Sequence, residues 1–250
     1  MVYADTPFHL PIFRGGLPGQ MILQENVVLL AEENSKMNTP KAIIFDLDGV
    51  LTDTSEYHYQ AWKHLADDEG IPFTRAENDA HLRGVGRRDS LLYLLKGRVV
   101  SEAEMQEMMD RKNRYYGELI ENMSPRDVVP GGVALLKEIQ QAGIKTAIAS
   151  ASKNTMTVLQ RLDLVSCFDG IADGNSVVHG KPAPDVFIFA AGLVKTPTRD
   201  CMGVEDANAG IEAIKVAGMT ALGIGPQERF SLADKVMDSL EKKTLKELLA

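Results

Sequence analysis

Two aspartates, Asp46 and Asp48, stand two residues apart directly after the apolar run Ala42–Phe45. Such a run is typical of a buried parallel strand, and Gly49 permits a sharp turn after it. In an open α/β sheet, reactive groups gather at the carboxyl ends of the strands. An Asp-x-Asp pair is also common in solvated turns, but its position after this run favours chemistry. The pair therefore indicates a metal ligand, a carboxylate nucleophile and a general acid.

Polar side chains also follow three later segments, at positions where we expect strand ends. They are Ser150-Ala151-Ser152 after Thr146–Ala149, Lys181-Pro182 after the His179-Gly180 loop, and Glu205-Asp206 after Met202–Val204. Together they offer carboxylates, a hydroxyl at a helix start and one lysine. These are the parts needed to bind a phosphoryl group and a divalent cation.

Like-charge repulsion is the obstacle that such a site must overcome. A carboxylate in contact with a phosphate faces about 4 kcal/mol per pair of unit charges at an effective dielectric of 20. Mg²⁺ held by Asp46 and Asp206, together with Lys181, would offset this repulsion, and Ser150 with the backbone N–H groups of the next helix would hold the phosphate oxygens. Asp46 is then placed to attack phosphorus and form an aspartyl phosphate. Asp48 can protonate the leaving oxygen and later deprotonate the incoming hydroxyl.

The elements that must position these residues alternate along the chain. The pattern predicts an α/β fold, in which one parallel sheet carries helices on both faces. The predicted strands are Ala42–Phe45, Lys145–Ala149, Gly170–Ala172, Cys201–Val204 and Thr220–Ile224, and the helices between them are Gly131–Ala142, Asn154–Leu162, Pro184–Leu193 and Ala207–Ala217.

The segment from Glu56 to Met123 has only helical periodicity, and no strand interrupts it. One apolar stripe contains Tyr57, Ala61, Trp62, Leu65 and Ala66, and a long amphipathic helix over Glu102–Ile120 buries Met105, Met108, Met109, Tyr116 and Ile120. This pattern predicts a helical cap domain over 54–124, inserted into a core domain made of 37–53 and 125–250. Residues 1–36 lack sustained periodicity and are predicted to be an extension, either poorly ordered or a docking element.

Composition narrows the function classes. The 250 residues are 44% hydrophobic, enough for a full core, and the net charge of -8 gives no basic field for nucleic acid. No apolar run approaches membrane-spanning length, and the N-terminus does not resemble a secretory signal. The two cysteines, Cys167 and Cys201, suit small core positions in a reducing compartment. We therefore expect a cytoplasmic monomer that binds neither nucleic acid nor membrane.

The four motifs, taken in order, resemble those of the haloacid dehalogenase-like (HAD) phosphotransferase superfamily. The resemblance covers Lys41 to about Gly225, and the combination is specific although each piece alone is not. It implies a Rossmann-like parallel sheet with an inserted cap. The place of the helical segment, between the first strand and Ser150, corresponds to the helical cap type.

Within the superfamily the resemblance narrows to the β-phosphoglucomutase family. The stretches that carry it are Phe45–Thr54, Tyr57-His58, Ala61-Trp62-Lys63, Leu82–Ser90, Arg111-Lys112-Asn113, Ser150–Asn154 and Lys181–Asp185. Such enzymes are isomerases that interconvert β-D-glucose 1-phosphate and D-glucose 6-phosphate. They work with Mg²⁺ through an aspartyl phosphate and β-glucose 1,6-bisphosphate, so sugar phosphates are the expected small-molecule partners.

The resemblance also implies roles for individual residues. Asp46 is the expected nucleophile and Asp48 the acid and base, while Thr54 and His58 help Asp48 reach its working position. The implied metal ligands are Asp46, the Asp48 carbonyl and Asp206, with Glu205 in support. The implied substrate-binding residues are Trp62, Gly84, Val85, Arg87, Lys112, Asn113, Ser150, Ala151, Ser152, Lys153, Asn154 and Lys181. Arg87, with Ser152, Lys153 and Asn154, would hold the second phosphate of the sugar.

The chain departs from the family pattern beside Arg87. A serine and an acidic residue are expected there, but Gly86 and Arg88 stand in their places. Arg88 adds a positive charge that would alter phosphate binding. Simpler explanations also exist for three assignments: His58 packing near Trp62, Lys112 and Asn113 on a solvated helix face, and Arg87 in a surface loop.

Three functions compete for this set of residues. The leading hypothesis is the mutase, in which a closing cap excludes water so that a sugar hydroxyl accepts the phosphoryl group. A sugar-phosphate phosphatase would use the same Asp46 and let water resolve the aspartyl phosphate. A non-catalytic binding module is disfavoured because Asp46, Asp48, Lys181 and Asp206 are all present.

Overall fold

The computed structural model describes residues 39–250 apart from residue 84. The expectations for residues 1–36 and for Gly84 therefore lie outside the described residues. Pro40–Ala250 form one compact unit. The division of this unit into a core domain and a cap domain remains a prediction.

A six-stranded parallel sheet, in the order β3-β2-β1-β4-β5-β6, forms the centre of this unit. The strands are β1 (Ala42–Phe45), β2 (Lys145–Ala149), β3 (Gly170–Ala172), β4 (Cys201–Glu205), β5 (Thr220–Ile224) and β6 (Lys235–Met237). Four of the five predicted strands have the predicted bounds, and β4 extends one residue further, to Glu205. The sequence analysis did not identify β6, because three half-buried residues carry too little periodic signal.

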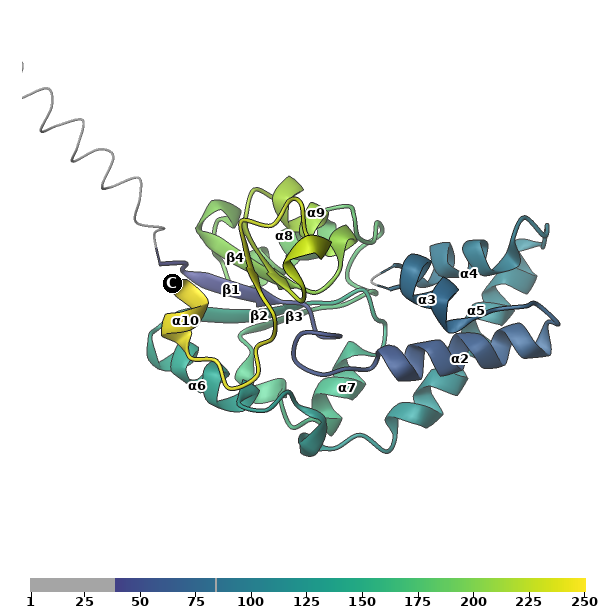
Figure 1. Ribbon diagram of the computed structural model, residues 1–250, viewed down its shortest axis with the longest axis horizontal. Helices are drawn as coiled ribbons and strands as arrows, with labels where there is room; N and C mark the ends of the chain where they lie inside the picture. The colour runs from purple at the N-terminus through teal and green to yellow at the C-terminus, as the bar shows by residue number, and fades with distance from the viewer. Residues whose placement is uncertain (1–38, 84) are drawn as a thin grey trace, which may run out of the picture. The chain divides into compact units, whose positions relative to one another are not determined.

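Helices cover both faces of the sheet, as predicted (Figure 1). Figure 1 shows α8 and α9 on one side and α6, α7 and α10 on the other. Their bounds are α6 (Gly132–Gln141), α7 (Thr155–Arg161), α8 (Asp185–Leu193), α9 (Asn208–Val216) and α10 (Leu245–Leu249). Alternate side chains of β1 enter the two cores, Ile43 and Phe45 on one face and Ala42 and Ile44 on the other. All four residues of β1 are buried, as expected for a strand whose sheet is covered by helices on both faces.

The first four α-helices after β1 come before α6, and we call them the inserted helices: α2 (Ser55–Asp68), α3 (Arg75–His81), α4 (Arg87–Leu95) and α5 (Glu102–Ile120). Local sequence signals begin two of them. Thr74 with Glu77 forms a capping box at α3, and Ser101 with Glu104 forms one at α5. The inserted helices have an apolar core of their own, made of Trp62, Leu65, Ala66, Phe73, Leu82, Leu91, Leu94, Leu95, Met105 and Met108.

The sheet register brings the motifs together. Phe45 pairs with Ile148 on one side and with Val204 on the other, so all three strands end at one edge. The Asp46 amide continues the ladder by donating to the Val204 carbonyl at 2.9 Å. Side chains that are far apart in the sequence are thus neighbours, as the strand-end argument predicts.

Candidate active site

Asp46 lies at the end of β1, where Gly49 turns the chain with a φ of 81°. A Cβ at Gly49 would lie 2.2 Å from Asp206 Oδ2, so a side chain is excluded by space as well as by conformation. Gly210, in α9, lies equally close to Glu205, since its Cβ would be 1.9 Å from Oε2. Both glycines let the backbone pack directly against the carboxylates.

Lys181 joins the two strand ends through a buried ion-pair network. Its Nζ donates to Asp46 Oδ1 at 2.5 Å and to Glu205 Oε2 at 2.7 Å. The other oxygen of Glu205 accepts the backbone N–H groups of Asp206 and Ala207 at 3.0 and 3.1 Å. Burial of a charge is costly unless it is paired and hydrogen-bonded, and here both carboxylates meet that condition.

The pKa values of this cluster reflect an excess of negative charge. Burial, followed by the Glu205 charge, raises the pKa of Asp46 well above its usual range, although Lys181 opposes the shift. Burial and Glu205 likewise raise the pKa of Asp206 to about 7, against the effect of Arg83. Burial would lower the pKa of Lys181, but Asp46 and Glu205 outweigh it and raise the value.

The carboxylate cluster fits a divalent cation. Asp46, Glu205 and Asp206 each offer a carboxylate oxygen, these oxygens lie within 4.8 Å of one another, and all three residues are buried. Oxygen donors are the ligands that Mg²⁺ prefers. Lys181 contacts two of these three buried carboxylates, so the cluster keeps negative charge that can bind a metal.

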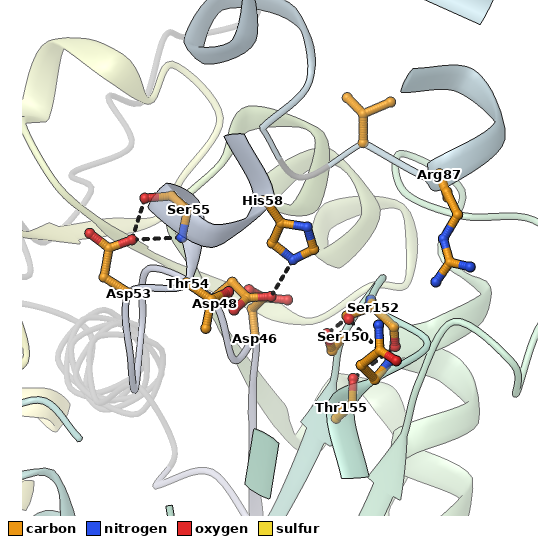
Figure 2. Close-up of polar contacts among 12 residues, drawn as sticks. Asp46, Asp48, Asp53, Thr54, Ser55, His58, Arg87, Ser150, Ser152 and Thr155 are labelled. Carbon is orange, nitrogen blue, oxygen red and sulfur yellow. Dashed lines mark hydrogen bonds and ion pairs between the residues drawn. The ribbon is translucent and has the colours of Figure 1, made fainter. Parts of the chain in front are cut away.

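Asp48 points to the start of the inserted helices (Figure 2). Thr54 Oγ1 donates to Asp48 Oδ1, and His58 Nε2 lies 3.7 Å from Asp48 Oδ2. Burial raises the pKa of Asp48, but the nearby His58 and the hydrogen bond from Thr54 outweigh it and hold the pKa below the usual value. Asp48 is therefore ionised and able to accept a proton.

Lys112, on α5, lies behind His58. Its Nζ is 2.9 Å from His58 Nδ1 and lies 5.0 and 4.8 Å from the ring centres of Trp62 and Tyr116. The His58 ring also stacks on Tyr116 with centres 4.1 Å apart. Lys112 is only 3% exposed, and burial, assisted by the Arg87 charge, lowers its pKa to about 7. The solvated-face explanation is therefore wrong for Lys112, and His58 does more than pack near Trp62.

Arg87, the first residue of α4, belongs to a bridge between the inserted helices and the α7 side of the sheet. The side-chain oxygen of Asn113 accepts from Arg87 Nη2 at 2.8 Å and from Asn154 Nδ2 at 2.6 Å. Arg87 is partly buried, and burial lowers its pKa, so it is not a free surface-loop residue. Two donors, one from each side of the cavity, thus converge on one oxygen.

The loop after β2 forms the opposite wall. Ser150 Oγ accepts the backbone N–H of Ser152 at 3.1 Å, and Ser152 Oγ accepts that of Asn154 at 3.2 Å. These turns precede α7 and expose polar groups toward the space below Arg87 (Figure 2).

One cavity collects most of the predicted site residues. It encloses about 840 Å³ of empty space, a volume that includes the open solvent at its mouth. The predicted residues that line it are Asp46, Asp48, His58, Trp62, Val85, Arg87, Lys112, Ser150, Ala151, Ser152, Lys153, Lys181 and Asp206. Thr54, Asn113, Asn154 and Glu205 contact these residues from behind.

Arg83 is the charged residue of this cavity lining that the sequence analysis missed. It lines the cavity and donates to Asp206 Oδ2 through Nε at 2.9 Å and Nη2 at 2.6 Å. The available signal was its place four residues before Arg87, the first residue of α4. Arg88, by contrast, pairs with exposed Glu102 at 2.9 and 2.7 Å and does not line the cavity, and its expected influence on phosphate binding stays a prediction.

Other expectations have mixed outcomes. Cys167 and Cys201 are buried free thiols, as predicted. None of the helices in the described part of the chain combines the length and apolarity needed to cross a bilayer. The cytoplasmic location and the monomeric state stay predictions.

Comparison with known proteins identifies the family. Residues 40–218 match the model of the haloacid dehalogenase-like hydrolases. A β-phosphoglucomutase of Bacillus subtilis is 44% identical over 209 residues, which cover 82% of this chain and 92% of that protein. A phosphorylated carbohydrates phosphatase of Thermotoga maritima is 30% identical over 186 residues, covering 72% and 82%.

A solved structure agrees with these relatives. The crystal structure of β-phosphoglucomutase from Clostridium difficile superimposes with a TM-score of 0.80 at 38% identity, over 84% of this chain and 95% of that one. Fold, strand-end carboxylates and sequence identity lead to the same conclusion: the chain belongs to the haloacid dehalogenase-like hydrolase family of enzymes.

Proposed function

We propose that this enzyme is a mutase that interconverts β-D-glucose 1-phosphate and D-glucose 6-phosphate. The observation that carries the proposal is that one cavity is lined by two sets of groups suited to a phosphate. Asp46, Lys181 and Ser150 come from the strand-end side, and Arg87 comes from the inserted helices. A sugar with a phosphate at each end would occupy both sets. The 44% identity to a Bacillus subtilis protein named β-phosphoglucomutase supports the same activity.

The reaction begins with phosphorylation of Asp46 by β-glucose 1,6-bisphosphate. A carboxylate oxygen of Asp46 bonds to phosphorus while the bond from phosphorus to the sugar oxygen breaks. At this step Asp48 carries the proton that it took from the acceptor hydroxyl in the preceding phosphoryl transfer, and it gives this proton to the leaving oxygen. Lys181, 2.5 Å from Asp46, neutralises charge on the phosphoryl group as it moves.

The second half transfers the phosphoryl group to a new sugar. The 6-hydroxyl of β-glucose 1-phosphate attacks the phosphorus on Asp46, Asp48 accepts the hydroxyl proton, and the Asp46 carboxylate is released. Asp48 is suited to this step because its lowered pKa keeps it ionised. The bisphosphate then presents its other phosphate to Asp46, and repetition of the first step yields glucose 6-phosphate.

Mg²⁺ is the proposed cofactor, held by Asp46, Asp206 and the Asp48 carbonyl, with Glu205 in support. When bound, it would neutralise the phosphate oxygens and so reduce their repulsion from the carboxylates. The inserted helices are the proposed cap, since Arg87, Lys112 and His58 all come from them and Asn113 joins them to Asn154. Closure of this cap would exclude water from the aspartyl phosphate.

A sugar-phosphate phosphatase is the second candidate, because the Thermotoga maritima relative is named as one. The two reactions share Asp46 and differ in what accepts the phosphoryl group. The test is a ³¹P NMR assay of the purified protein with Mg²⁺, either anomer of glucose 1-phosphate and a trace of the bisphosphate. Glucose 6-phosphate from the β-anomer alone supports the mutase. Stoichiometric inorganic phosphate supports the phosphatase and overturns the proposal.

A further inference from the structure

Arg83 connects the inserted helices to the carboxylate cluster. It lies in the loop between α3 and α4, and its Nε and Nη2 both donate to Asp206 Oδ2, at 2.9 and 2.6 Å. The Asp206 side chain is almost fully buried, whereas that of Arg83 is about one-third exposed. Within the described residues, no other ion pair to Asp206 is found.

Gly49 leaves room for the contact between Arg83 and Asp206 because it has no side chain. A Cβ at Gly49 would lie 3.0 Å from Arg83 Nη2 as well as 2.2 Å from Asp206 Oδ2. Gly49 therefore allows the guanidinium and the carboxylate to meet above the end of β1. Arg229 holds the same residue from the other side, donating from Nη1 to the Asp206 carbonyl at 3.1 Å.

The charges of the carboxylate cluster indicate how the contact between Arg83 and Asp206 affects binding of a divalent cation. Asp46, Glu205 and Asp206 are three carboxylates, and Lys181 and Arg83 are the two cations that contact them. With the three carboxylates ionised, the cluster keeps one net negative charge while Arg83 is engaged and two without it. A divalent cation would therefore leave the cluster neutral if Arg83 has moved away, but positive if Arg83 stays.

The lone pairs of the Asp206 carboxylate also indicate that Arg83 and a metal interfere with each other. A carboxylate oxygen has two acceptor sites, and Arg83 donates to Asp206 Oδ2 twice. While Arg83 is engaged, Oδ2 is not available to a metal, and only Oδ1 of this residue remains.

We propose that Arg83 and a divalent cation compete for Asp206, and that a phosphoryl group in the cavity allows both to be present. The inference rests on the proposed metal site. A phosphate dianion adds two negative charges, so the cluster with a divalent cation again has a place for the positive charge of Arg83. With the cation bound, contact of Arg83 with Asp206, and with it closing of the inserted helices on the core, thereby depends on an occupied phosphate site. Arg83 is a positioning residue in this scheme, because it acts through Asp206.

The test is a calorimetric Mg²⁺ titration of the full chain without any sugar. Arg83→Gln should bind Mg²⁺ at least about fivefold more tightly than the original protein, the lower range of measured coupling between sites. Arg83→Lys keeps the charge and should stay within about twofold. Arg88→Gln is the matched control, because Arg88 lies in the same part of the chain but pairs with Glu102 at the surface. Thermal unfolding of each variant verifies the fold.

Several results of these titrations would contradict competition between Arg83 and Mg²⁺. Equal or weaker Mg²⁺ binding by Arg83→Gln overturns the competition, as does an equal gain in Arg83→Lys or in Arg88→Gln. Failure of the original protein and of Arg83→Gln to bind Mg²⁺ also overturns it. Saturating inorganic phosphate should reduce the difference between Arg83→Gln and the original protein, and an unchanged difference contradicts the role of the phosphoryl group. The titration measures no turnover, so its result does not depend on whether the enzyme is a mutase or a phosphatase. Failure of the competition and failure of the proposed mutase activity can therefore be told apart.

Discussion

The two walls of the cavity balance their charges in opposite ways. On the wall formed by the strand ends, three carboxylates have Lys181 as their only cation from the same wall. On the wall formed by the inserted helices, Arg87 and Lys112 have neutral partners, Asn113 and His58. Within the described residues, no carboxylate forms an ion pair with either cation.

The difference indicates which ligand each wall receives. The strand-end wall lacks positive charge and suits a metal, whereas the inserted helices lack negative charge and suit a phosphate. Arg83 is the exception, since it belongs to the inserted helices but gives its charge to Asp206. The walls are therefore complementary, and the following experiments test each of them.

Asp46→Asn should have the largest effect, because an uncharged amide cannot accept the phosphoryl group. We expect formation of glucose 6-phosphate to fall by at least about four orders of magnitude, as when a nucleophile is removed. Asp200→Asn is the control, since Asp200 pairs with Lys41 at the start of β1, away from the cavity. Retention of more than about one-hundredth of the rate in Asp46→Asn would remove Asp46 from the reaction.

Lys181→Met should cause the largest loss of stability on the strand-end wall. It leaves Asp46 and Glu205 buried without their shared cation, which costs about 3–5 kcal/mol. Urea unfolding measures the change. Lys215→Met breaks a half-exposed ion pair with Asp234 and should cost under about 1 kcal/mol. A similar small loss in both variants would show that the buried carboxylates do not need the lysine.

The strand-end wall could be predicted from sequence, whereas the other wall could be predicted only in part. Asp46, Ser150 and Asp206 follow short apolar runs, and parallel strands bring such positions to one edge regardless of loop length. Helical periodicity places Lys112 on the apolar face of α5, four residues from both Met108 and Tyr116, but it cannot show that a lysine there is buried. Its burial depends on contacts with His58 and Trp62 of α2 as well as with Tyr116 of α5.

Arg83 illustrates the same limit. An arginine in a polar loop is usually solvated, and nothing within Leu82–Ser90 indicates an acidic partner 123 residues later in the chain. The family pattern led to Arg87, which lines the cavity, whereas Arg88 departs from that pattern and pairs with Glu102. Contacts that depend on how the inserted helices meet the sheet require the structure.

Lys112→Met tests the charge of the second wall through stability. The pKa of Lys112 is lowered to about 7 by burial, and its value in an unfolded chain is about 10.4. Between these values the unfolded protein binds the additional proton, so the stability of the original protein rises with pH. Below about pH 7 the cost of the buried cation is fully present. Lys112→Met removes that cost and should be more stable at low pH.

The size of the effect follows from the same linkage. The gain of Lys112→Met over the original protein should shrink on the order of 3 kcal/mol between about pH 6.5 and about pH 9.5. Asp48, Arg87, His58 and Tyr116 surround Lys112 and remain in both proteins. Lys63→Met, at an exposed ion pair with Asp67, serves as control and should shift stability by under about 1 kcal/mol at either pH. A gain that does not depend on pH would mean that Lys112 keeps its proton throughout this range, so that its pKa is not lowered.

Arg87→Ala should have the smallest effect of the four and is the most specific. Removal of the guanidinium should raise the KM for β-glucose 1-phosphate by about 10- to 100-fold, the loss of one charge-assisted bidentate contact. Phosphorylation of Asp46 by acetyl phosphate should continue at nearly the original rate, because this small donor has no second phosphate to bind. Arg88→Ala, at the surface pair with Glu102, is the matched control for both measurements. Equal loss of sugar-phosphate use and of acetyl phosphate use would mean that Arg87 supports the strand-end wall, and the assignment of one ligand to each wall would then be wrong.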